Sequence, residues 1–334
     1  MPLNLIRIRL SRIPENICDK DMDIQAGKKI DVIIPVYKPT ERILSLFLML
    51  FKQTVKPSKV VVINTEEEYW NDFFGDFDIL AKYPFIELHH ITKNSFDHGR
   101  TRNLGVSHSD EEFFLMMTDD AIPDDEFLIE NLLKNFEDAK VGMVYARQIP
   151  HKGCRAIEKY TRAFNYPLNR TVKGAKDIPT LGIKAFYASN VCCMYRKSIF
   201  AEMGGFIQRT IFNEDMIYAR RMIDKGYLIV YEPSAQVRHS HNYSGMQYLK
   251  RNFDLGVSHA DNPEIFGDVK AEGEGKRLVM STAKFLCKKF MPWMVVVLVY
   301  HSGCKYIGYR LGCGYRKLSK KTILKFTMSP GYFS

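Results

Sequence analysis

The chain has 334 residues and a net charge of +10, and hydrophobic residues make up 46% of it. This balance is typical of a globular protein with one large domain or two. No stretch reaches the roughly 18 apolar residues of a membrane-spanning helix, and residues 1–12 lack the continuous apolar core of a secretory signal peptide. We therefore expect neither a helical membrane span nor a cleaved leader.

Positive charge is concentrated near the C-terminus. Twelve of the 48 basic side chains lie in residues 276–334, which contain no Asp or Glu, so the first 275 residues carry 36 basic and 38 acidic side chains. Such asymmetry predicts an acidic partner for the tail, either anionic lipid or nucleic acid. A nucleic-acid binder should carry a basic stripe over its folded domain. The first 275 residues are slightly acidic, so we expect no nucleic acid. The tail either contacts an anionic membrane surface or packs its apolar run, residues 293–300, on the rest of the chain.

The seven cysteines form no CxxC pair and are odd in number. This pattern disfavours a zinc cluster or a disulfide framework and is typical of a reducing compartment. It indicates a cytoplasmic protein, peripheral on the inner face of the cell membrane if the tail binds lipid.

Strands and helices alternate through the first 145 residues, after an irregular N-terminal arm over residues 1–29. Apolar runs predict strands at residues 31–37, 59–64, 85–90, 113–117 and 141–145. Helical spacing predicts helices after the N-cap Thr40, from residue 97, and over residues 129–136. The alternation predicts an α/β fold with a mainly parallel sheet between two layers of helices.

The second half of the chain is less regular. Residues 148–184 are a loop-rich, aromatic and polar stretch, typical of a binding lid but also of plain surface. We expect strands at 189–195, 227–231 and 237–243, and a helix that begins at Asn213 and ends at Gly226. This divides the chain into a catalytic domain at residues 30–260 and a basic helical region at residues 261–334.

Two adjacent carboxylates, Asp119 and Asp120, follow the strand at residues 113–117. The carboxyl ends of parallel strands are where open α/β sheets bind ligands. Hard carboxylate oxygens suit Mg²⁺ or Mn²⁺, which often bridge a protein to substrate phosphates. The alternative is an acidic first turn of a helix, because residues 122–125 are predicted to be a turn that opens one.

His239 ends a predicted strand, so its imidazole could share a metal ion with the Asp pair. The alternative is a hydrogen-bonded structural histidine. Glu214 and Asp215 open a predicted helix, where a carboxylate could act as a general base or only as a cap.

A basic segment at residues 97–103 supplies two arginines, Arg100 and Arg102, at a predicted helix start. Guanidinium groups at a helix N-terminus suit phosphate. A surface charge cluster is the alternative explanation.

Taken in order, these features resemble the family 2 glycosyltransferases with the Rossmann-like GT-A fold. The double Asp is similar to their metal-binding DXD motif, and Glu214-Asp215 is similar to their ED motif, which carries the base. Three segments look like the bacterial rhamnosyltransferase branch of the family: residues 96–103, 213–216 and 239–244. The resemblance covers roughly residues 30–260.

The resemblance implies a role for each site residue. Asp215 would be the base, with Glu214 as the next candidate, and Asp120 and His239 would hold the metal. Asp119 would contact ribose or metal-bound water, and Arg100 or Arg102 the nucleotide. The nucleotide pocket would also include Pro35, Tyr37, Asn64 and Asp97. Many members carry an acidic residue near position 64, so Asn64 is a departure from the family pattern.

The implied reaction is inverting transfer of a sugar, L-rhamnose from dTDP-L-rhamnose, to a hydroxyl of a cell-surface polysaccharide or a lipid-linked oligosaccharide. The alternatives are another nucleotide sugar such as a UDP-sugar, or a nucleotidyltransferase. A non-enzymatic alternative is a basic-tailed protein that binds membrane or nucleic acid.

Overall fold

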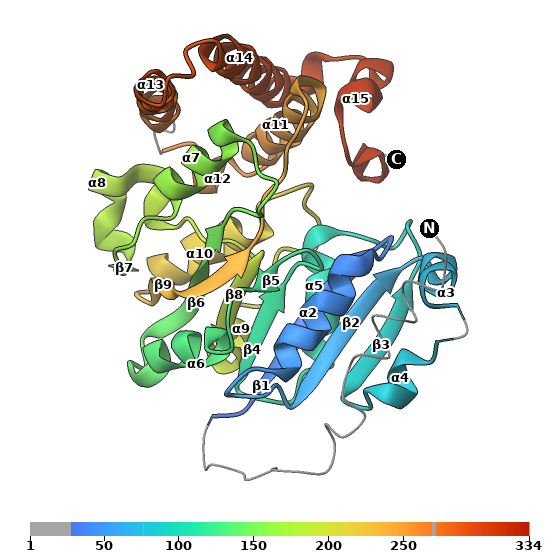
Figure 1. Cartoon of the computed structure of the whole chain (residues 1–334). Coiled ribbons are helices and arrows are strands. Elements are labelled where there is room, and N and C mark those ends of the chain that lie inside the picture. The colour runs from blue at the N-terminus through green and yellow to red at the C-terminus, as the bar shows by residue number, and fades with distance from the viewer. Residues whose placement is uncertain (1–27, 76, 269–271, 334) are drawn as a thin grey trace.

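The computed structural model describes residues 28–75, 77–268 and 272–333. The N-terminal arm predicted for residues 1–29 lies outside the described residues, except for Lys28 and Lys29. Within the described part, a nine-stranded sheet has the order β3-β2-β1-β4-β8-β6-β9-β5, and β7 pairs with β9 (Figure 1). The strands are β1 (Ile30–Tyr37), β2 (Lys59–Thr65), β3 (Ile86–Ile91), β4 (Phe113–Met117), β5 (Ile122–Pro123), β6 (Val141–Ile149), β7 (Thr171–Lys173), β8 (Cys192–Arg196) and β9 (Leu228–Arg238).

Most neighbouring strands are parallel. β3, β2, β1 and β4 run in one direction, and β6 pairs with β9 in parallel. β8 lies antiparallel between β4 and β6. The predicted α/β architecture, a mixed and mainly parallel sheet flanked by helices, is confirmed.

Helices cover both faces of this sheet, because successive side chains of a strand point to opposite sides. Val32 and Ile34 of β1 are fully buried in the core that contains α2, whereas Ile33 packs in the core that contains α5. The helices on the first face are α2 (Glu41–Phe51), α3 (Glu67–Phe74), α4 (Ile79–Lys82) and α6 (Leu128–Leu133), which continues into η1 (Lys134–Glu137). Those on the second face are α5 (His98–Ser107), α9 (Lys197–Glu202) and α10 (Glu214–Asp224).

Three segments differ from the sequence prediction. Residues 122 and 123 form the short strand β5 instead of a turn, because they pair with the end of β9. Proline is tolerated there because β5 is an edge strand. The predicted loop-rich stretch contains the ten-residue helix α7 (Ala156–Asn165), followed by η2 (Ala175–Asp177), α8 (Ile178–Leu181) and η3 (Gly182–Ala185). β9 runs unbroken where two strands were expected, because a bulge at residues 233–235 lets β6 pair with the strand on both sides of it.

The remaining helices gather at one end of the molecule (Figure 1). They are α11 (Gly245–Asp261), α12 (Pro263–Phe266), α13 (Glu272–Lys288), α14 (Met294–Cys313) and α15 (Lys320–Phe326), with η4 (Tyr315–Lys317) and η5 (Pro330–Phe333). We call α11 to η5 the C-terminal unit. Because α11 packs along α14, the predicted boundary at residue 260 separates two helices that lie in contact, and the division into domains stays a prediction.

Glycines allow α11 and α14 to approach closely. A Cβ added at Gly308 would lie 2.2 Å from the carbonyl oxygen of Leu249, and one at Gly312 would lie 2.1 Å from that of Phe253. Both contacts are far shorter than atoms tolerate, so a side chain at either position would force the helices apart. Among the described helices, none combines the length and the apolarity required to cross a bilayer.

Candidate functional site

Pairing of β5 with β9 brings the Asp pair beside the histidine that was predicted to share its metal. Ile122 is the partner of Arg238, so the residue before β5 and the residue after β9 face each other. Asp120 Oδ1 lies 3.5 Å from His239 Nε2, and Asp120 Oδ2 lies 3.3 Å from His241 Nε2. The sequence-predicted residues Asp120 and His239 are therefore brought together, and His241 joins them.

Three ligand atoms converge at this point. One oxygen or nitrogen from each of Asp120, His239 and His241 lies within 4.8 Å of the other two. The two Nε2 atoms are 3.0 Å apart. Thr118 donates a hydrogen bond of 2.9 Å to Asp120 Oδ1, and Arg42 lies 3.7 Å from Oδ2. The donor set of two imidazoles and one carboxylate fits a divalent metal ion.

The sequence analysis did not predict that His241 would join Asp120 and His239. The signal was present, because residues 239 and 241 are two apart after a strand, and extended chain places such side chains on the same side. The spacing alone could not show that both imidazoles face the Asp pair, since that depends on the β5–β9 pairing.

A second layer of side chains fixes the orientation of His239. Its Nδ1 lies 2.9 Å from Gln148 Oε1, and the same oxygen accepts a hydrogen bond from Arg162. A guanidinium only donates, so the Gln148 oxygen faces both groups and His239 Nδ1 carries the proton. The unprotonated Nε2 therefore presents its lone pair to the site, as a metal ligand must.

Burial supports the same protonation state. His239 is 7% exposed, and loss of hydration lowers the pKa of its imidazole to about 3. A neutral imidazole is the form that binds metal. Asp119 lies beside these ligands, and burial, followed by the charge of Asp120, raises the pKa of its carboxyl to about 7. Its predicted contact with ribose or metal-bound water stays a prediction.

The second carboxylate pair, Glu214 and Asp215, opens α10 and approaches the same end of the sheet. Asn190 stands just before β8 and holds both carboxylates. Its backbone amide donates to Asp215 Oδ2 at 2.9 Å, and its side-chain amide donates to Glu214 Oε1 at 2.9 Å. The Thr118 amide donates to the Val191 carbonyl, so the loop that carries Asp120 and the residue that holds Asp215 are adjacent.

Asp215 and Glu214 differ in charge state. Burial, followed by the nearby Glu214 charge, raises the pKa of Asp215 to about 7. Burial also disfavours the Glu214 carboxylate, but Arg102, whose Nε lies 3.1 Å away, together with His98 and the Asn190 hydrogen bond, holds the pKa of Glu214 below its usual value. A carboxyl with a pKa near the working pH suits proton transfer, and an ion-paired one does not.

Arg102 is thus placed differently from the expectation of a phosphate donor at a helix start. It is 7% exposed, it forms the ion pair with Glu214, and its Nη1 donates to the His98 carbonyl at 2.9 Å. These contacts give Arg102 a role in setting the charge of Glu214. Arg100 is exposed and donates to the Ser95 carbonyl at 2.8 Å. A nucleotide contact by either arginine stays a prediction.

Asp97 is the N-cap of α5. Its Oδ1 accepts hydrogen bonds from the amides of Gly99 and Arg100, and its Oδ2 accepts one from Thr210. These bonds tie the start of α5 to the segment before α10, so Asp97 positions the helix that carries Arg102. Its direct contact with a nucleotide stays a prediction.

The other predicted nucleotide residues lie at the carboxyl ends of β1 and β2. Pro35 and Tyr37 are paired with residues of β2, and the Tyr37 ring is 43% exposed and packs edge-on against Tyr69. Asn64 is fully buried and donates to the Glu66 carbonyl, and its Oδ1 is an acceptor without a partner among the described residues. The exposed aromatic ring is a feature that a nucleobase could use, whereas the Asn64 oxygen is closed off from solvent.

Comparisons with known proteins agree with this arrangement. The family model of glycosyl transferase family 2 matches residues 31–204. The chain is 36% identical over 308 residues to the O-antigen chain rhamnosyltransferase RfbN of Salmonella typhimurium, an alignment that covers 92% of this chain and 96% of that one. It is 37% identical over 306 residues to the O-antigen chain rhamnosyltransferase WbaN of Salmonella anatum, covering 91% and 95%.

Among solved structures, the mannosyltransferase PcManGT of Pyrobaculum calidifontis, in complex with GDP-Man and Mn²⁺, has a similar fold. The TM-score is 0.51 at 15% identity, over 99% of this chain and 92% of that one. Identity this low supports the fold alone.

Proposed function

Because this chain belongs to glycosyl transferase family 2, we propose that it transfers L-rhamnose to a hydroxyl of a growing surface polysaccharide or its lipid-linked precursor. Two O-antigen rhamnosyltransferases align with it over nearly their whole length. The observation that carries the proposal is the position of Asp120, His239, His241 and Asp215 at adjacent strand and helix ends. We propose dTDP-L-rhamnose as the donor, and another nucleotide sugar, such as a UDP-sugar, is the competing choice.

Asp215 is the proposed base of a single in-line displacement. The acceptor oxygen forms a bond to the anomeric carbon while the bond from that carbon to the diphosphate oxygen breaks. The acceptor proton passes to an oxygen of Asp215. A pKa of about 7 leaves this carboxyl able to take a proton near neutral pH. Arg102 keeps Glu214 ionised, and that charge in turn raises the basicity of Asp215.

Asp120, His239 and His241 are the proposed ligands of a divalent metal ion, Mg²⁺ or Mn²⁺. When bound, such an ion would neutralise the charge that develops on the leaving diphosphate. Two imidazoles favour Mn²⁺ over Mg²⁺, because Mg²⁺ prefers oxygen ligands. Gln148 and Arg162 hold His239 with its lone pair toward the ion.

The nucleotide is proposed to lie over the ends of β1 and β2. Tyr37 offers an exposed ring on which a base can stack, and Asn64 lies near the end of the neighbouring strand β2. Pro35, Asp97, Arg100, Arg102 and Asp119 complete the proposed pocket.

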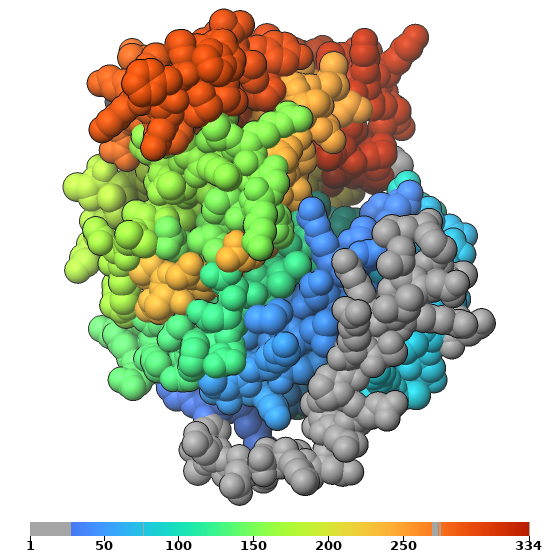
Figure 2. All heavy atoms as spheres, in the orientation of Figure 1, coloured from blue at the N-terminus to red at the C-terminus, as the bar shows by residue number. Residues whose placement is uncertain are grey.

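The C-terminal unit is proposed to bind the cytoplasmic face of a membrane that carries the acceptor. Phe290 is 86% exposed, Trp293 66% and Val296 73%, and the lysines 284, 288 and 289 beside them are exposed. α13 and α14, in orange, form a ridge along one end of the molecule (Figure 2). Exposed aromatic and aliphatic side chains next to lysines suit the interface of an anionic bilayer.

A donor screen tests the proposed function. Purified protein is incubated with a set of nucleotide sugars, with Mn²⁺, Mg²⁺ or EDTA, and released nucleoside diphosphate is measured. We expect turnover with dTDP-L-rhamnose, more with Mn²⁺ than with Mg²⁺, and none with EDTA. Turnover of a different nucleotide sugar in preference to dTDP-L-rhamnose would reject the donor, and turnover undiminished by EDTA would reject the metal.

A further inference from the structure

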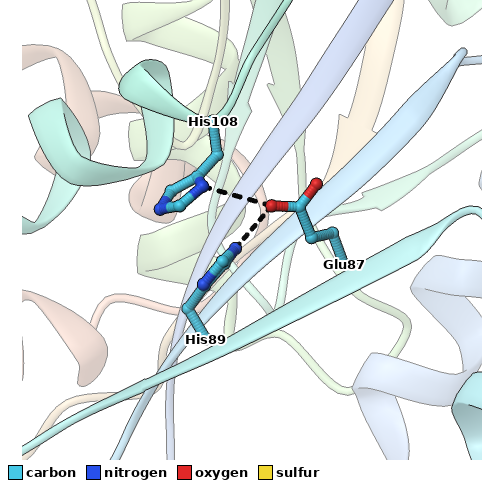
Figure 3. Close-up of side chains that lie close together, drawn as sticks. All are labelled: Glu87, His89 and His108. Carbon is cyan, nitrogen blue, oxygen red and sulfur yellow. Dashed lines mark hydrogen bonds and ion pairs between the residues drawn. The ribbon is translucent and has the colours of Figure 1, made fainter.

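A second group of two imidazoles and one carboxylate is formed by β3 and the end of α5 (Figure 3). Glu87 and His89 are two apart on β3, so their side chains leave the same face of the strand. His108 is the C-cap of α5 and approaches them from the helix layer. Glu87 is near the amino end of a parallel strand, whereas Asp120 follows the carboxyl end of another, so the two groups are separate.

Both imidazoles point at one oxygen. Glu87 Oε1 lies 2.6 Å from His89 Nε2 and 3.2 Å from His108 Nδ1, and the three atoms lie within 4.8 Å of one another. The two rings stack with their centroids 3.7 Å apart. Each of the three side chains is between 29% and 35% exposed, so solvent reaches the group.

Lys59 holds the other carboxylate oxygen. Its ammonium lies 3.0 Å from Glu87 Oε2 and 2.8 Å from Asp110 Oδ2. One ammonium is thus shared by two carboxylates, which leaves a net negative charge beside the imidazoles. Lys59 also fixes the orientation of Glu87, so that Oε1 faces the two histidines, as an outer-shell partner does for a metal-binding carboxylate.

We propose that Glu87, His89 and His108 bind a divalent transition-metal ion of the Zn²⁺ class. Two imidazole nitrogens and a carboxylate oxygen are a ligand set of zinc sites, with bonds of about 2.0–2.2 Å, and water takes the fourth position. Tetrahedral geometry with these bond lengths separates neighbouring ligand atoms by roughly 3.3 Å. The separations of 2.6 and 3.2 Å require only small side-chain movements to reach it.

Such an ion would join the edge strand of the sheet to the end of a helix. Among the strands that the structure describes, β3 is outermost on its side of the sheet and pairs with β2 alone. Through His108, the ion would connect β3 to α5, the helix that carries Arg102 near its middle. Metal bound only to the folded chain stabilises it by binding linkage.

The competing explanation is a metal-free cluster in which both imidazoles donate N–H groups to Glu87 Oε1. The two explanations predict different affinities of the protein for metal ions. The parent protein for these measurements is the full chain with Asp120→Asn and His241→Gln, called the host. These two substitutions remove the metal site proposed near His239, so that it does not contribute to the measured binding. Into this host we place His89→Gln, His108→Gln, and, as a matched control, His301→Gln on α14, far along the chain from the cluster.

Zn²⁺ binding is measured by competition with a chromophoric chelator, and Co²⁺ binding by visible absorption. We expect one Zn²⁺ per host chain and a tetrahedral Co²⁺ spectrum, both unchanged by His301→Gln. Loss of a single ligand should weaken Zn²⁺ binding at least about tenfold, since even outer-shell changes cost that much. Equal affinity in the host and in both cluster variants, or a host that binds no Zn²⁺, would overturn the proposal.

Discussion

The candidate site, which contains Asp120 and Asp215, differs from the C-terminal unit in the kind of side chain that it exposes. In the candidate site, His239 and Glu214 are less than 9% exposed, and each has several polar partners. In the C-terminal unit, large apolar side chains such as Phe290 and Trp293 are more than half exposed. Buried polar groups that are fully paired hold a fixed geometry, as chemistry requires, whereas exposed apolar surface of this kind marks an interaction site.

The largest expected effect is on sugar transfer at the candidate site. Asp215→Asn keeps the size of the side chain but cannot take a proton, so sugar transfer should fall by about two to four orders of magnitude. Donor binding should persist, because Asp215 accepts hydrogen bonds from the backbone amides of Asn190 and Met216, and the Asn oxygen can keep one of them and so preserve the local structure. Initial rates and donor affinity, measured together, check this.

The pH profile sharpens the assignment of the base. Because the folded-state pKa of Asp215 is raised to about 7, its carboxyl is protonated below that pH and ionised above it. Transfer should therefore rise with pH through about 7 and then level off. A rate for Asp215→Asn close to the unmodified rate would make Asp215 a helix cap and leave Glu214 as the base.

In the C-terminal unit, the largest effect should be on stability. Gly308→Ala places a Cβ 2.2 Å from a backbone carbonyl of α11, which cannot move like a side chain. The overpacking should lower the free energy of unfolding by about 3 kcal/mol, the upper end of the usual range. Denaturant unfolding measures this change.

Gly303→Ala on the same helix is the matched control, because a Cβ there meets nothing within 4 Å. It should be neutral or stabilising by up to about 1 kcal/mol, the helix preference of Ala over Gly. Equal losses in the two variants would mean that α11 and α14 are not packed as described.

A smaller effect is expected from the residue behind His239. Gln148→Leu removes the acceptor of the Nδ1 proton, so the imidazole can adopt the other tautomer and turn its lone pair away. Affinity for Mn²⁺ should fall about 10- to 100-fold. Calorimetric titration checks this, and the exposed Gln208→Leu serves as a control. Unchanged affinity in Gln148→Leu would refute the orienting role.

The weakest expected effect concerns membrane binding. Phe290→Ser or Trp293→Ser should weaken binding to anionic vesicles about tenfold, which corresponds to roughly half of the free energy of burying such a ring. Leu168→Ser is the matched control, because Leu168 is 72% exposed outside the C-terminal unit. Binding should also fall in high salt. Equal indifference of the protein to anionic and neutral vesicles at low salt would make the unit structural only.

The positions of the two carboxylate pairs could be predicted from the sequence, because the signals for a strand end and a helix start are local. A strand followed by Asp119-Asp120, and a helix opened by Glu214-Asp215, have fixed positions once the strands are identified. The partners Gln148, Asn190 and Arg162 carry no such signal, because they reach the site through pairing of β6 with β9, pairing of β8 with β4, and packing of α7. The helix α7 was missed because its polar and aromatic composition also suits a loop.

In the C-terminal unit, the sequence predicted helices and charge but not orientation. The apolar run at residues 293–300 was compatible with a helix that buries Trp293 or one that exposes it. The structure exposes Trp293, the residue just before α14, while Gly308 and Gly312 later in this helix face α11. That choice depends on close helix packing, which composition does not encode.

The central claim is that Asp120, His239 and His241 bind a divalent ion together with the donor diphosphate. The most direct measurement is a titration of dTDP into the metal-free protein, with and without Mn²⁺, followed by thermal unfolding. We expect dTDP to raise the melting temperature only when Mn²⁺ is present, and Asp120→Asn to abolish that increase while the variant stays folded. An equal increase without metal, or one that survives in Asp120→Asn, would contradict the account.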